Sequence, residues 1–521
     1  MVANLRAVLG ASNLFVDEVT LRTCSTDASP CFLVPQAVVR VSSESDVVET
    51  LRICAAHGVP VTPRAAGTSL SGAAIGAGVV LDTTHLAAIR EFNPAEGWVR
   101  VEPGVQLRDL NAFLREKGFR FPLEPGSLDW CRIGGMLGHN ASGYQSVKYG
   151  QTADYVLALR VVLADGTVFE ARDVPLDGPE WGSLLARVPA LEAVRQTISS
   201  HSDAILRHRR PVKKHACGYD LAYLAEALGR GAFPLARLFV GAEGTLGVVT
   251  EATLRVLPLP TRTVTLLLFL DRFEELGPLV EDLLPLRPSA LEGIDGDSLD
   301  VLGRGAHGIP PQARAMILVE FDDEDFESRI DRISREIVPR HALSRPMEIA
   351  SSLERQTALW SARRSLFPTL LRQPGRRRPW GFVEDSIVPT SRVPEFITFL
   401  VSLTRKHGTV AGIYGHLGDG NIHYRPLFDP TDPEDFERMR AMREEFDDAV
   451  LDRFQGAPSA EHGIGRIRGE ALSRTWGPEV VGVMRSIKET LDPRALLNPG
   501  VLLASTSWWE AWGGLESREA Q

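Results

Sequence analysis

Cysteine is scarce in this sequence. Its 521 residues include five cysteines, and no two of them form a Cys-x-x-Cys pair. This scattered placement argues against a disulfide framework and against an iron–sulfur cluster bound by this chain alone. Long apolar runs are also absent, because no stretch reaches the roughly 20 residues that a membrane-spanning helix needs. The first residues lack the apolar core and cleavage site of a signal peptide. We therefore expect a cytoplasmic protein, with peripheral contact to the inner membrane left open.

The chain also lacks an excess of positive charge. Its formal net charge is −10 at pH 7, which argues against nucleic acid as a partner. The basic cluster Arg376–Arg378 lies in a proline- and glycine-containing stretch and is interpreted as a solvated loop. With 44% hydrophobic and 24% charged residues, the composition is typical of a soluble globular protein. A chain of this length is too long for one hydrophobic core, so two or three domains are expected.

Glycine, in contrast, is gathered into loops that follow predicted strands. Residues 62–76 form a loop rich in glycine, serine and threonine between predicted strands at 59–61 and 79–82. Backbone N–H groups in such a loop can point at an anion such as a phosphate. Residues 122–150 are a second glycine-rich stretch, and a glycine-rich bend separates two strands predicted within 238–260. These stretches suit close wrapping around a flat, polar cofactor, although none has the spacing of a Rossmann or Walker A loop.

Histidines are concentrated in two motifs. The sequence YGHLGDGNIHYR predicts a β-hairpin, because Asp419-Gly420 favours a type I′ turn. A turn at that pair places His416 directly opposite His423, with Cβ atoms about 5 Å apart on one face. Farther along, Glu461 and His462 lie side by side among glycines. Two imidazoles and a carboxylate form a ligand set for Zn²⁺ or a similar divalent ion, while a glycine-rich hairpin with surface histidines is the simpler alternative.

Alternating strands and helices after residue 260 predict a second structural unit. Strands are expected at 263–270 and 316–321, and helices at 272–284, 324–337, 353–371 and 392–407. Such alternation favours an antiparallel sheet with helices on one face. We therefore expect an α+β protein. Its expected parts are a first domain at residues 1–260, a second at 261–465, a C-terminal helical segment at 466–505 and a tail at 506–521.

The order of these motifs resembles that of a known family. The chain contains, in order, PRAAGTSLSG, VEPGV, IGGMLGHNASG, FVGAEGTLGVVTE, GHLGDGNIH, EHGIG and LDPRALLNPG. It resembles the FAD-linked oxidases of the vanillyl-alcohol-oxidase/p-cresol-methylhydroxylase (VAO/PCMH) superfamily over residues 25–502. Within that superfamily it looks like the D-2-hydroxyacid dehydrogenase branch, which includes D-lactate dehydrogenases, the glycolate oxidase flavin subunit and D-2-hydroxyglutarate dehydrogenase. The resemblance implies a two-part FAD-binding domain of the PCMH/VAO type in residues 1–260, and a smaller α+β substrate (cap) domain with an antiparallel sheet.

The resemblance also implies that FAD is bound noncovalently, since the loop that would hold its pyrophosphate contains no histidine. His139 stands where we expect asparagine, which leaves an unusual contact or a covalent tether open. The residues implied to bind FAD lie in the glycine-rich stretches and in the LLNPG motif. They are Arg64, Ala65, Ala66, Gly67, Thr68, Ser69, Leu70, Pro125, Gly126, Ser127, Gly134, Gly135, Gly138, Asn140, Ser142, Gly143, Glu243, Gly244, Gly247, Val248 and Asn498.

A reaction follows from the same resemblance. It implies FAD-dependent oxidation of a small D-2-hydroxy acid, of the D-lactate or glycolate class, to the 2-oxo acid, with hydride transfer to flavin N5. Such a reaction needs a base for the hydroxyl proton and a cation for the carboxylate, and a Lewis acid on the oxygen atoms assists it. The predicted ligands of a divalent metal, zinc by preference, are His416, His423 and Glu461. The predicted catalytic residues are His462 as the base, Arg363 for the substrate carboxylate and Asn421 as a further substrate contact.

A few residues bear on the identity of the substrate and of the electron acceptor. Arg363 follows Trp360 by three residues, as in the family, and Arg364 is its competitor. Glu384-Asp385 occupies a place where some relatives carry a lysine, which argues against a dicarboxylate substrate. Because the chain has no cluster ligands of its own, we expect a non-nicotinamide acceptor, either a separate iron–sulfur subunit or a quinone. A homodimer is left open.

Other interpretations stay open at this stage. A zinc-dependent hydrolase would use Glu461 as its base, and a non-catalytic flavin subunit of a larger glycolate oxidase complex would keep the glycine-rich loops without turnover. A redox-neutral ether-lipid synthase also belongs to the superfamily, but the histidine motifs fit the dehydrogenases better. Trp508 and Trp512 are spaced as i, i+4 and are interpreted as packing residues. A docking surface for an iron–sulfur subunit is the alternative for this pair.

Overall fold

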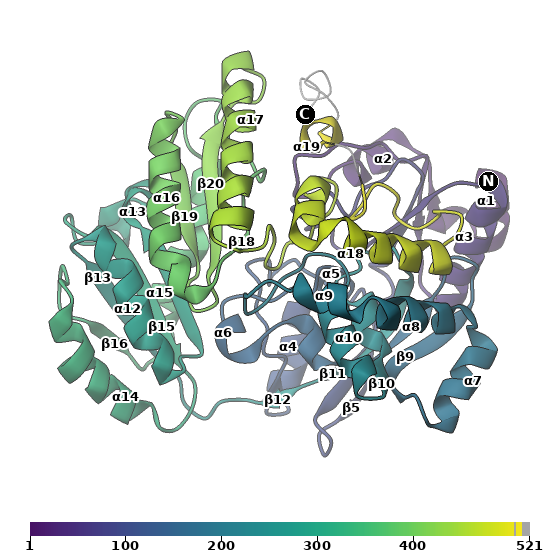
Figure 1. Cartoon of the computed structure of the whole chain (residues 1–521), viewed down its shortest axis with the longest axis horizontal. Coiled ribbons are helices and arrows are strands. Elements are labelled where there is room, and N and C mark those ends of the chain that lie inside the picture. Colours follow the sequence, from purple (N-terminus) through teal and green to yellow (C-terminus); the bar gives the residue numbers. More distant parts are fainter. Residues whose placement is uncertain (505–506, 513–521) are drawn as a thin grey trace.

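The computed structural model describes residues 1–504 and 507–512 as two bodies that lie side by side (Figure 1). The body on the right contains the purple and blue N-terminal elements, with the yellow helix α18 across its top. The body on the left contains the teal and green elements. The chain passes from the first body to the second near residue 260, but the division into domains at that point stays a prediction.

A four-stranded sheet begins the N-terminal body, in the order β1-β2-β4-β3, with β2, β4 and β3 parallel. The helix between β2 and β3, α3 (Glu44–His57), begins with a capping box of Ser43 and Asp46 and ends at Gly58 in the left-handed conformation. The glycine-rich loop of residues 62–76 leaves the C-terminal end of β3, the edge at which parallel sheets bind ligands. The strands are β1 (Leu14–Phe15), β2 (Ala37–Arg40), β3 (Val61–Arg64) and β4 (Val79–Asp82).

A six-stranded antiparallel sheet forms the other layer of this body, in the order β10-β9-β8-β11-β6-β5. The strand predicted near residue 238 is wrong, because these residues belong to the short helix α11 (Leu235–Phe239). A short apolar run is compatible with either a strand or a buried helix, and here tertiary packing decides. The strands are β5 (Ile89–Asn93), β6 (Trp98–Val101), β8 (Val156–Val162), β9 (Val168–Pro175), β10 (Ala232–Pro234) and β11 (Val248–Arg255), with β7 (Phe119–Arg120) paired to β12 (Leu257–Pro258). The other helices are α1 (Val2–Leu9), α2 (Glu18–Cys24), α4 (Leu107–Arg115), α5 (Ile133–His139), α6 (Ser146–Tyr149), α7 (Pro179–Arg187), α8 (Ala190–Ser200), α9 (Ser202–Arg207) and α10 (Leu221–Gly229).

The second body is built on the predicted antiparallel sheet, in the order β16-β13-β15-β14-β19-β20-β17, with β18 also paired to β20. Helices cover both faces of this sheet, and not one face as predicted. The reason is visible in β13 and β15, in which every residue is buried, so that both faces need a covering layer. The strands are β13 (Val264–Leu270), β14 (Ala290–Asp295), β15 (Ala315–Phe321), β16 (Glu348–Ala350), β17 (Arg378–Pro379), β18 (Ser386–Ile387), β19 (Ala411–His416) and β20 (Asn421–Phe428). One face packs on α12 (Leu276–Leu283), α14 (Phe326–Arg332), α16 (Val393–Lys406) and α17 (Pro433–Asp448), and the other on α13 (Gly296–Leu302) and α15 (Leu353–Leu371).

The C-terminal segment connects the two bodies. Helix α18 (Gly469–Leu491) is kinked at Gly477 and packs Val481, Met484 and Ile487 into the core of the N-terminal body. The chain then returns to the second body as α19 (Trp508–Ala511). The Trp508 ring stacks on Phe382 with centroids 5.6 Å apart, and both Trp508 and Trp512 are buried. The packing interpretation of the two tryptophans is therefore confirmed, because buried indoles cannot form a docking surface.

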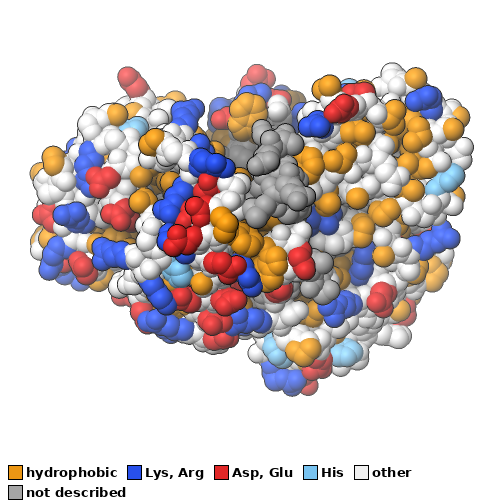
Figure 2. Space-filling model, turned by 90° about the horizontal axis from the view of Figure 1, so that it is seen from above, with side chains coloured by type: hydrophobic (Ala, Val, Ile, Leu, Met, Phe, Trp, Pro, Cys, Tyr) orange, Lys and Arg blue, Asp and Glu red, His pale blue; other side chains and the backbone are white. Residues whose placement is uncertain are grey.

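The outer surface carries charges of both signs. Figure 2 shows basic and acidic side chains interspersed on the face seen from above, most densely over its left-hand half. This mixing follows from ion pairs one turn apart on surface helices, such as Arg438 with Glu434 on α17. None of the helices in residues 1–504 and 507–512 combines the length and the apolar character that crossing a membrane requires.

A polar contact on Asp322, the residue that follows β15, links the two bodies. Arg120 and Lys148 of the N-terminal body lie 2.7 Å and 2.5 Å from the Asp322 carboxylate, and the Tyr149 hydroxyl donates to it at 2.6 Å. Burial raises the pKa of Asp322, but the hydrogen bonds from Lys148 and Tyr149 and the charge of Arg120 outweigh burial. They lower the pKa below the ordinary value of 3.8. The ionised carboxylate therefore stabilises the folded protein.

We expect Asp322→Asn to lower the free energy of unfolding by about 2 kcal/mol at pH 7, since three donors lose the charge of a fully buried acceptor. Because the folded-state pKa is depressed, this stabilisation is complete above pH 3.8 and is lost as the pH falls through the lowered value. Urea midpoints at pH 7, 5 and 3.5 measure the difference. Asp323→Asn is the matched control, since that side chain is 38% exposed and surface pairs contribute little. An equal effect of the two variants, or an effect of Asp322→Asn that does not depend on pH, contradicts this role.

Candidate active site

A cavity of about 510 Å³ lies between the two bodies, within the size range of ligand sites. Its walls on the N-terminal side come from the three glycine-rich stretches that the sequence singled out. All residues predicted to bind FAD line this cavity except Asn140, Gly143 and Asn498. The stretches are far apart in sequence, and the fold brings them to one surface.

Asn140, Gly143 and Asn498 do not line the cavity but stabilise the segments that form its walls. Asn140 ends α5 with φ of +51° and accepts a hydrogen bond from the Ala153 N–H at 2.9 Å. A Cβ at Gly143 would lie 2.1 Å from the Glu124 carbonyl oxygen, so close backbone approach requires glycine there. The Asn498 amide donates to the carbonyls of Ala73 and Glu243, at 2.9 Å and 2.7 Å. These contacts position the cavity walls and do not face the cavity.

The shape of the walls suits a flat cofactor with a phosphate group. Gly135 and Gly138 line the cavity, and a Cβ at either position would meet nothing within 4 Å. Glycine therefore leaves room at these points that side chains would fill. Arg64, in contrast, donates through Nη1 to the carbonyls of Thr26 and Ala74, at 2.9 Å and 3.0 Å, and so braces the predicted phosphate loop. The cradle fits FAD through its backbone more than through the charge of Arg64.

The hairpin that carries the two histidines has a different register from the predicted one. His416 pairs with Asn421, and Tyr414 pairs with His423. The type I′ turn is wrong because Gly420 has φ of +83° while Asp419 stays out of the left-handed region, so that four residues connect the strands. The two histidines still share one face as diagonal neighbours, with ring centroids 5.2 Å apart.

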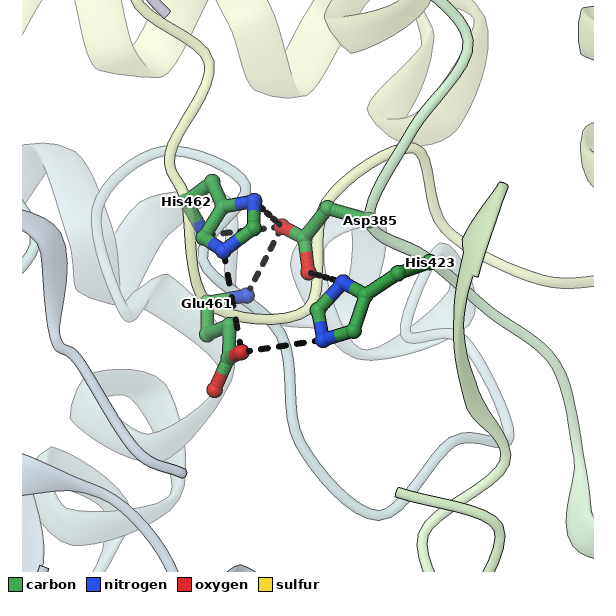
Figure 3. A group of neighbouring side chains, drawn as sticks. All are labelled: Asp385, His423, Glu461 and His462. Carbon is green, nitrogen blue, oxygen red and sulfur yellow. Dashed lines mark hydrogen bonds and ion pairs between the residues drawn. The ribbon is translucent and has the colours of Figure 1, made fainter. Parts of the chain in front are cut away.

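Three imidazoles converge on one carboxylate oxygen. Glu461 Oε1 lies 3.2 Å from His416 Nε2, 3.5 Å from His423 Nε2 and 3.7 Å from His462 Nε2. Figure 3 shows His423 and His462 reaching Glu461 from a strand and from a loop. The structure therefore gathers the three predicted metal ligands and the predicted base at one end of the cavity. Nitrogen and carboxylate oxygen at this spacing form a donor set that suits Zn²⁺.

The carboxylates around these imidazoles favour a positive charge, as the pKa values of two histidines indicate. Burial lowers the pKa of His416, but the charges of Glu292 and Glu461 outweigh burial and raise it to about 9. Burial and the neighbouring charge of His416 lower the pKa of His423 well below its usual value, so this imidazole is neutral and free to act as a ligand. The carboxylates of Glu292 and Glu461 thus favour a positive charge at this end of the cavity, which a divalent cation would supply.

Asp385 lies next to the cluster, but it anchors the loop that carries Glu461 and His462 (Figure 3). Its Oδ2 accepts hydrogen bonds from the backbone N–H groups of both residues, at 3.1 Å and 2.7 Å, and from the Ser459 hydroxyl at 2.7 Å. Its Oδ1 accepts from the Asn421 amide at 3.2 Å. Oδ2 is thus committed to the loop, whereas Oδ1 keeps a free lone pair, lies 4.0 Å from His423 Nδ1 and belongs to the group of side chains that could hold a metal ion.

Asn421 does not take the place expected for a substrate contact. It is fully buried, is not among the described residues that line the cavity, and donates to Asp385 Oδ1 and to the Ser386 carbonyl. Its side chain occupies the same face of β20 as His423, but at the turn end, where β18 covers it. Asn421 therefore supports Asp385, which in turn anchors the loop of Glu461 and His462.

Glu384 fixes the orientation of the predicted base. Its carboxylate accepts from His462 Nδ1 at 2.7 Å and pairs with Arg425 at 3.0 Å and with Arg468 at 2.5 Å. The bond assigns the Nδ1 position to the proton and leaves Nε2 of neutral His462 as an acceptor. Burial lowers the pKa of His462, but the charges of Asp385 and Glu384 outweigh it and raise the pKa above its usual value. The sequence singled out Glu384 only as the site of a missing lysine.

Arg363 lines the same cavity and is held by a residue that sequence reasoning missed. Its Nε donates to Glu292 Oε2 at 2.9 Å, and Glu292 Oε1 lies 2.5 Å from His416 Nδ1. Its guanidinium lies over the rings of Tyr414 and Tyr144, at 4.6 Å and 5.3 Å from the centroids. Arg364, its competitor, also lines the cavity, but its side chain is 48% exposed. Glu292 lies on β14, a strand that was not predicted.

Two family models match this chain. The FAD binding domain matches residues 35–172, and the C-terminal domain of FAD linked oxidases matches residues 259–502. Glycolate oxidase subunit GlcD of Bacillus subtilis is 30% identical over 489 residues, which cover 92% of each chain. This chain belongs to the FAD-linked oxidase family. It is an oxidoreductase, and the zinc-hydrolase alternative is therefore wrong.

Other relatives of this FAD-linked oxidase differ in length. D-2-hydroxyglutarate dehydrogenase of Pantoea ananatis is 30% identical over 503 residues, but the match spans 91% of this chain and 48% of that relative. D-lactate dehydrogenase of Anaerostipes hadrus is 27% identical over 480 residues, 89% of each chain. Among solved structures, p-cresol methylhydroxylase gives a TM-score of 0.69 at 16% identity and covers 96% of both chains. The 4-ethylphenol oxidase of Gulosibacter chungangensis gives 0.68 at 17%. These likenesses confirm the α+β fold of the PCMH/VAO type.

Two buried groups in this FAD-linked oxidase join the FAD-binding walls to the loop of His462. The Glu243 carboxylate accepts from the N–H groups of Ile464 and Gly465, both at 2.8 Å, and burial raises its pKa to about 7. The ring of His139 packs against Gly463, where a Cβ would lie 2.5 Å from Nδ1. Burial lowers the pKa of His139 to about 4, so it is neutral. The noncovalent attachment of FAD and the alternative of a tether at His139 stay predictions.

Proposed function

We propose that this FAD-linked oxidoreductase oxidises a small D-2-hydroxy acid of the D-lactate or glycolate class to the corresponding 2-oxo acid. One observation carries the proposal. The cavity built by the FAD-binding stretches ends at a carboxylate surrounded by three imidazoles, beside a buried arginine. The names of the relatives support the substrate class, since they include a glycolate oxidase subunit and a D-lactate dehydrogenase.

A divalent metal ion, zinc by preference, would be held by His416, His423 and Glu461. The ring of His416 is oriented for this by Glu292 at Nδ1, an arrangement common among metal-binding histidines. A cation bound there supplies Lewis acidity toward the oxygen atoms of the substrate, and FAD supplies the acceptor for the hydrogen from C2. All three side chains are buried and line the cavity.

The remaining steps belong to side chains of this chain. Arg363 binds the substrate carboxylate, for which a planar guanidinium in a buried wall is well suited. His462 accepts the hydroxyl proton at Nε2, because Nδ1 is committed to Glu384. The charge of Glu384 then stabilises the protonated imidazole. Asn421 acts through Asp385 on the loop that presents His462, in place of the direct substrate contact expected from the sequence.

Electrons would leave to a non-nicotinamide acceptor, for which a separate iron–sulfur subunit or a quinone is proposed. The printed name of the Bacillus subtilis relative describes it as a subunit, which supports a multi-component assembly. We also propose that the chain forms a homodimer and contacts the inner membrane peripherally.

Anaerobic bleaching of the bound flavin tests the reaction. We expect glycolate or D-lactate to bleach the flavin and L-lactate to be much slower, since one enantiomer alone presents both oxygen groups and C2–H correctly. Treatment with a chelator should lower the rate by about 10²-fold or more, because a Lewis acid contributes several kcal/mol to such a step. Zinc should restore the rate. If no 2-hydroxy acid bleaches the flavin, the chain is a non-catalytic flavin subunit, and if chelation leaves the rate unchanged the metal proposal is wrong.

A further inference from the structure

Lys214 is a buried cation of the N-terminal body that reaches the catalytic cluster. Its side chain is 4% exposed, and its Nζ donates to the Ser142 hydroxyl at 2.6 Å and to the Ser146 hydroxyl at 2.9 Å. The same Nζ lies 3.6 Å from Glu461 Oε2 and 3.5 Å from Asp419 Oδ2. Lys214 therefore stands between the wall of the FAD cavity and two acidic residues of the second body.

The two carboxylate oxygens of Glu461 have different partners. Ser142 lies 2.6 Å from Glu461 Oε2, and because its hydroxyl accepts from Lys214 it is left to donate to that oxygen. Oε2 is thus held by the N-terminal body. Oε1 alone faces the Nε2 atoms of His416, His423 and His462. The carboxylate is fixed in the orientation that one-oxygen coordination of a metal ion requires.

Lys214 also compensates the negative charges of two buried carboxylates. Glu461 and Asp419 are both buried, and a buried carboxylate is costly unless a cation compensates it. An ionised, oriented carboxylate is what a metal ligand must be.

We propose that Lys214 is a positioning residue for the metal ion: together with Ser142 it holds Glu461 Oε2, so that Oε1 is turned toward the histidines. This inference rests on the proposed function, in which His416, His423 and Glu461 hold a divalent cation. In this arrangement Lys214 and Ser142 of the N-terminal body hold the Glu461 oxygen that does not face the histidines. Removal of such an outer partner weakens metal binding by about 10- to 100-fold.

Zinc titration of the purified, FAD-loaded protein after metal removal tests the proposal, with a competing colorimetric zinc indicator. Lys214→Gln keeps a hydrogen-bond donor but loses the charge, Lys214→Met loses both, and Lys214→Arg keeps the charge. Lys213→Met is the matched control, because the neighbouring Lys213 donates to the Gly418 carbonyl at 2.7 Å and not to Glu461. We expect the zinc dissociation constant to rise about 10- to 100-fold in Lys214→Met, less in Lys214→Gln and least in Lys214→Arg. The visible spectrum and FAD content should stay at wild-type values, and Lys213→Met should lie within about twofold of wild type.

The possible outcomes distinguish a failure of the role of Lys214 from a failure of the proposed metal site. If wild-type protein binds zinc and both neutral Lys214 variants bind it equally well, Lys214 has no role toward the metal and the proposed function is untouched. If wild-type protein binds no zinc, the metal proposal itself fails and the role of Lys214 falls with it. If the neutral variants lose FAD along with zinc while Lys214→Arg does not recover zinc affinity, Lys214 is a general structural residue and the proposal is wrong.

Discussion

Replacing His462 by Asn is expected to lower the rate of flavin reduction by about 10²- to 10⁴-fold, the usual contribution of a positioned general base. Asparagine keeps a donor near the position of Nδ1, so the bond to Glu384 at 2.7 Å can persist. What is lost is the Nε2 acceptor, which lies 3.7 Å from Glu461 Oε1 on the cavity side of the ring. The effect should therefore fall on the proton transfer and leave the FAD-binding walls intact.

Stopped-flow bleaching under anaerobic conditions measures the rate, and zinc and FAD contents of the same sample show whether the site is otherwise preserved. His407→Asn is the control, since that imidazole bonds Glu445 on the second body and takes no part in the cavity. A His462→Asn enzyme within about tenfold of wild type, with zinc and FAD at full occupancy, means that another group takes the proton.

The glycine-rich stretches could be located from sequence because glycine has no side chain to bury. Runs such as Gly134-Gly135 and the loop around Gly67 have little use in a packed core, so a polar, close-fitting ligand is their natural explanation. Asn140, Gly143 and Asn498 belong to the same motifs, yet they do not line the cavity. A motif identifies the segment near a ligand, but the direction of each side chain depends on the backbone bend that the motif makes.

The hairpin shows where a local rule gives way to tertiary structure. Asp419-Gly420 favours a two-residue turn by itself, but β19 also pairs with β14, where Glu292 stands opposite His416. On the other edge, β18 pairs with β20 at Asn421. Both neighbours constrain the register, and strand pairing outweighs the preference of one dipeptide. The change of register does not alter which side chains share a face of the sheet, so the rings of His416 and His423 still lie close together.

The partners of the catalytic side chains could not be found from sequence. Glu292 lies more than a hundred positions from His416, and Lys214 is farther still from Glu461. A lone glutamate or lysine in a sequence is usually a solvated surface residue. Only the packing of β14 against β19, and of the N-terminal body against the loop of Glu461, gives these charges buried partners.

The second large effect is expected at Asp385. Replacing it by Ala should lower the free energy of unfolding by about 3–5 kcal/mol, because buried donors lose the carboxylate that satisfies them. Those donors are the N–H groups of Glu461 and His462 and the hydroxyl of Ser459, all of which converge on Oδ2. The loop should open, and zinc affinity should fall with it, since this loop supplies both Glu461 and His462.

Asp385→Asn should be milder than Asp385→Ala. The asparagine oxygen can still accept from the loop in place of Asp385 Oδ2, and only the 3.2 Å hydrogen bond from the Asn421 amide to the other oxygen is lost. Urea unfolding and zinc titration of both variants should therefore rank wild type above Asn and Asn above Ala. Asp452→Ala is the control, since that side chain is 69% exposed in a surface ion pair and should cost less than about 0.5 kcal/mol.

The ranking separates an anchor from a metal ligand. If Asp385 coordinated the metal directly, neutral Asn would lose most of the zinc affinity while leaving the stability of the metal-free protein almost unchanged. If it anchors the loop, stability in the absence of metal and zinc affinity should fall together in both variants, and more in Ala. Unfolding measured after chelation decides between them, because a lost ligand has no effect there, whereas unsatisfied backbone donors destabilise the loop whether or not a metal is bound.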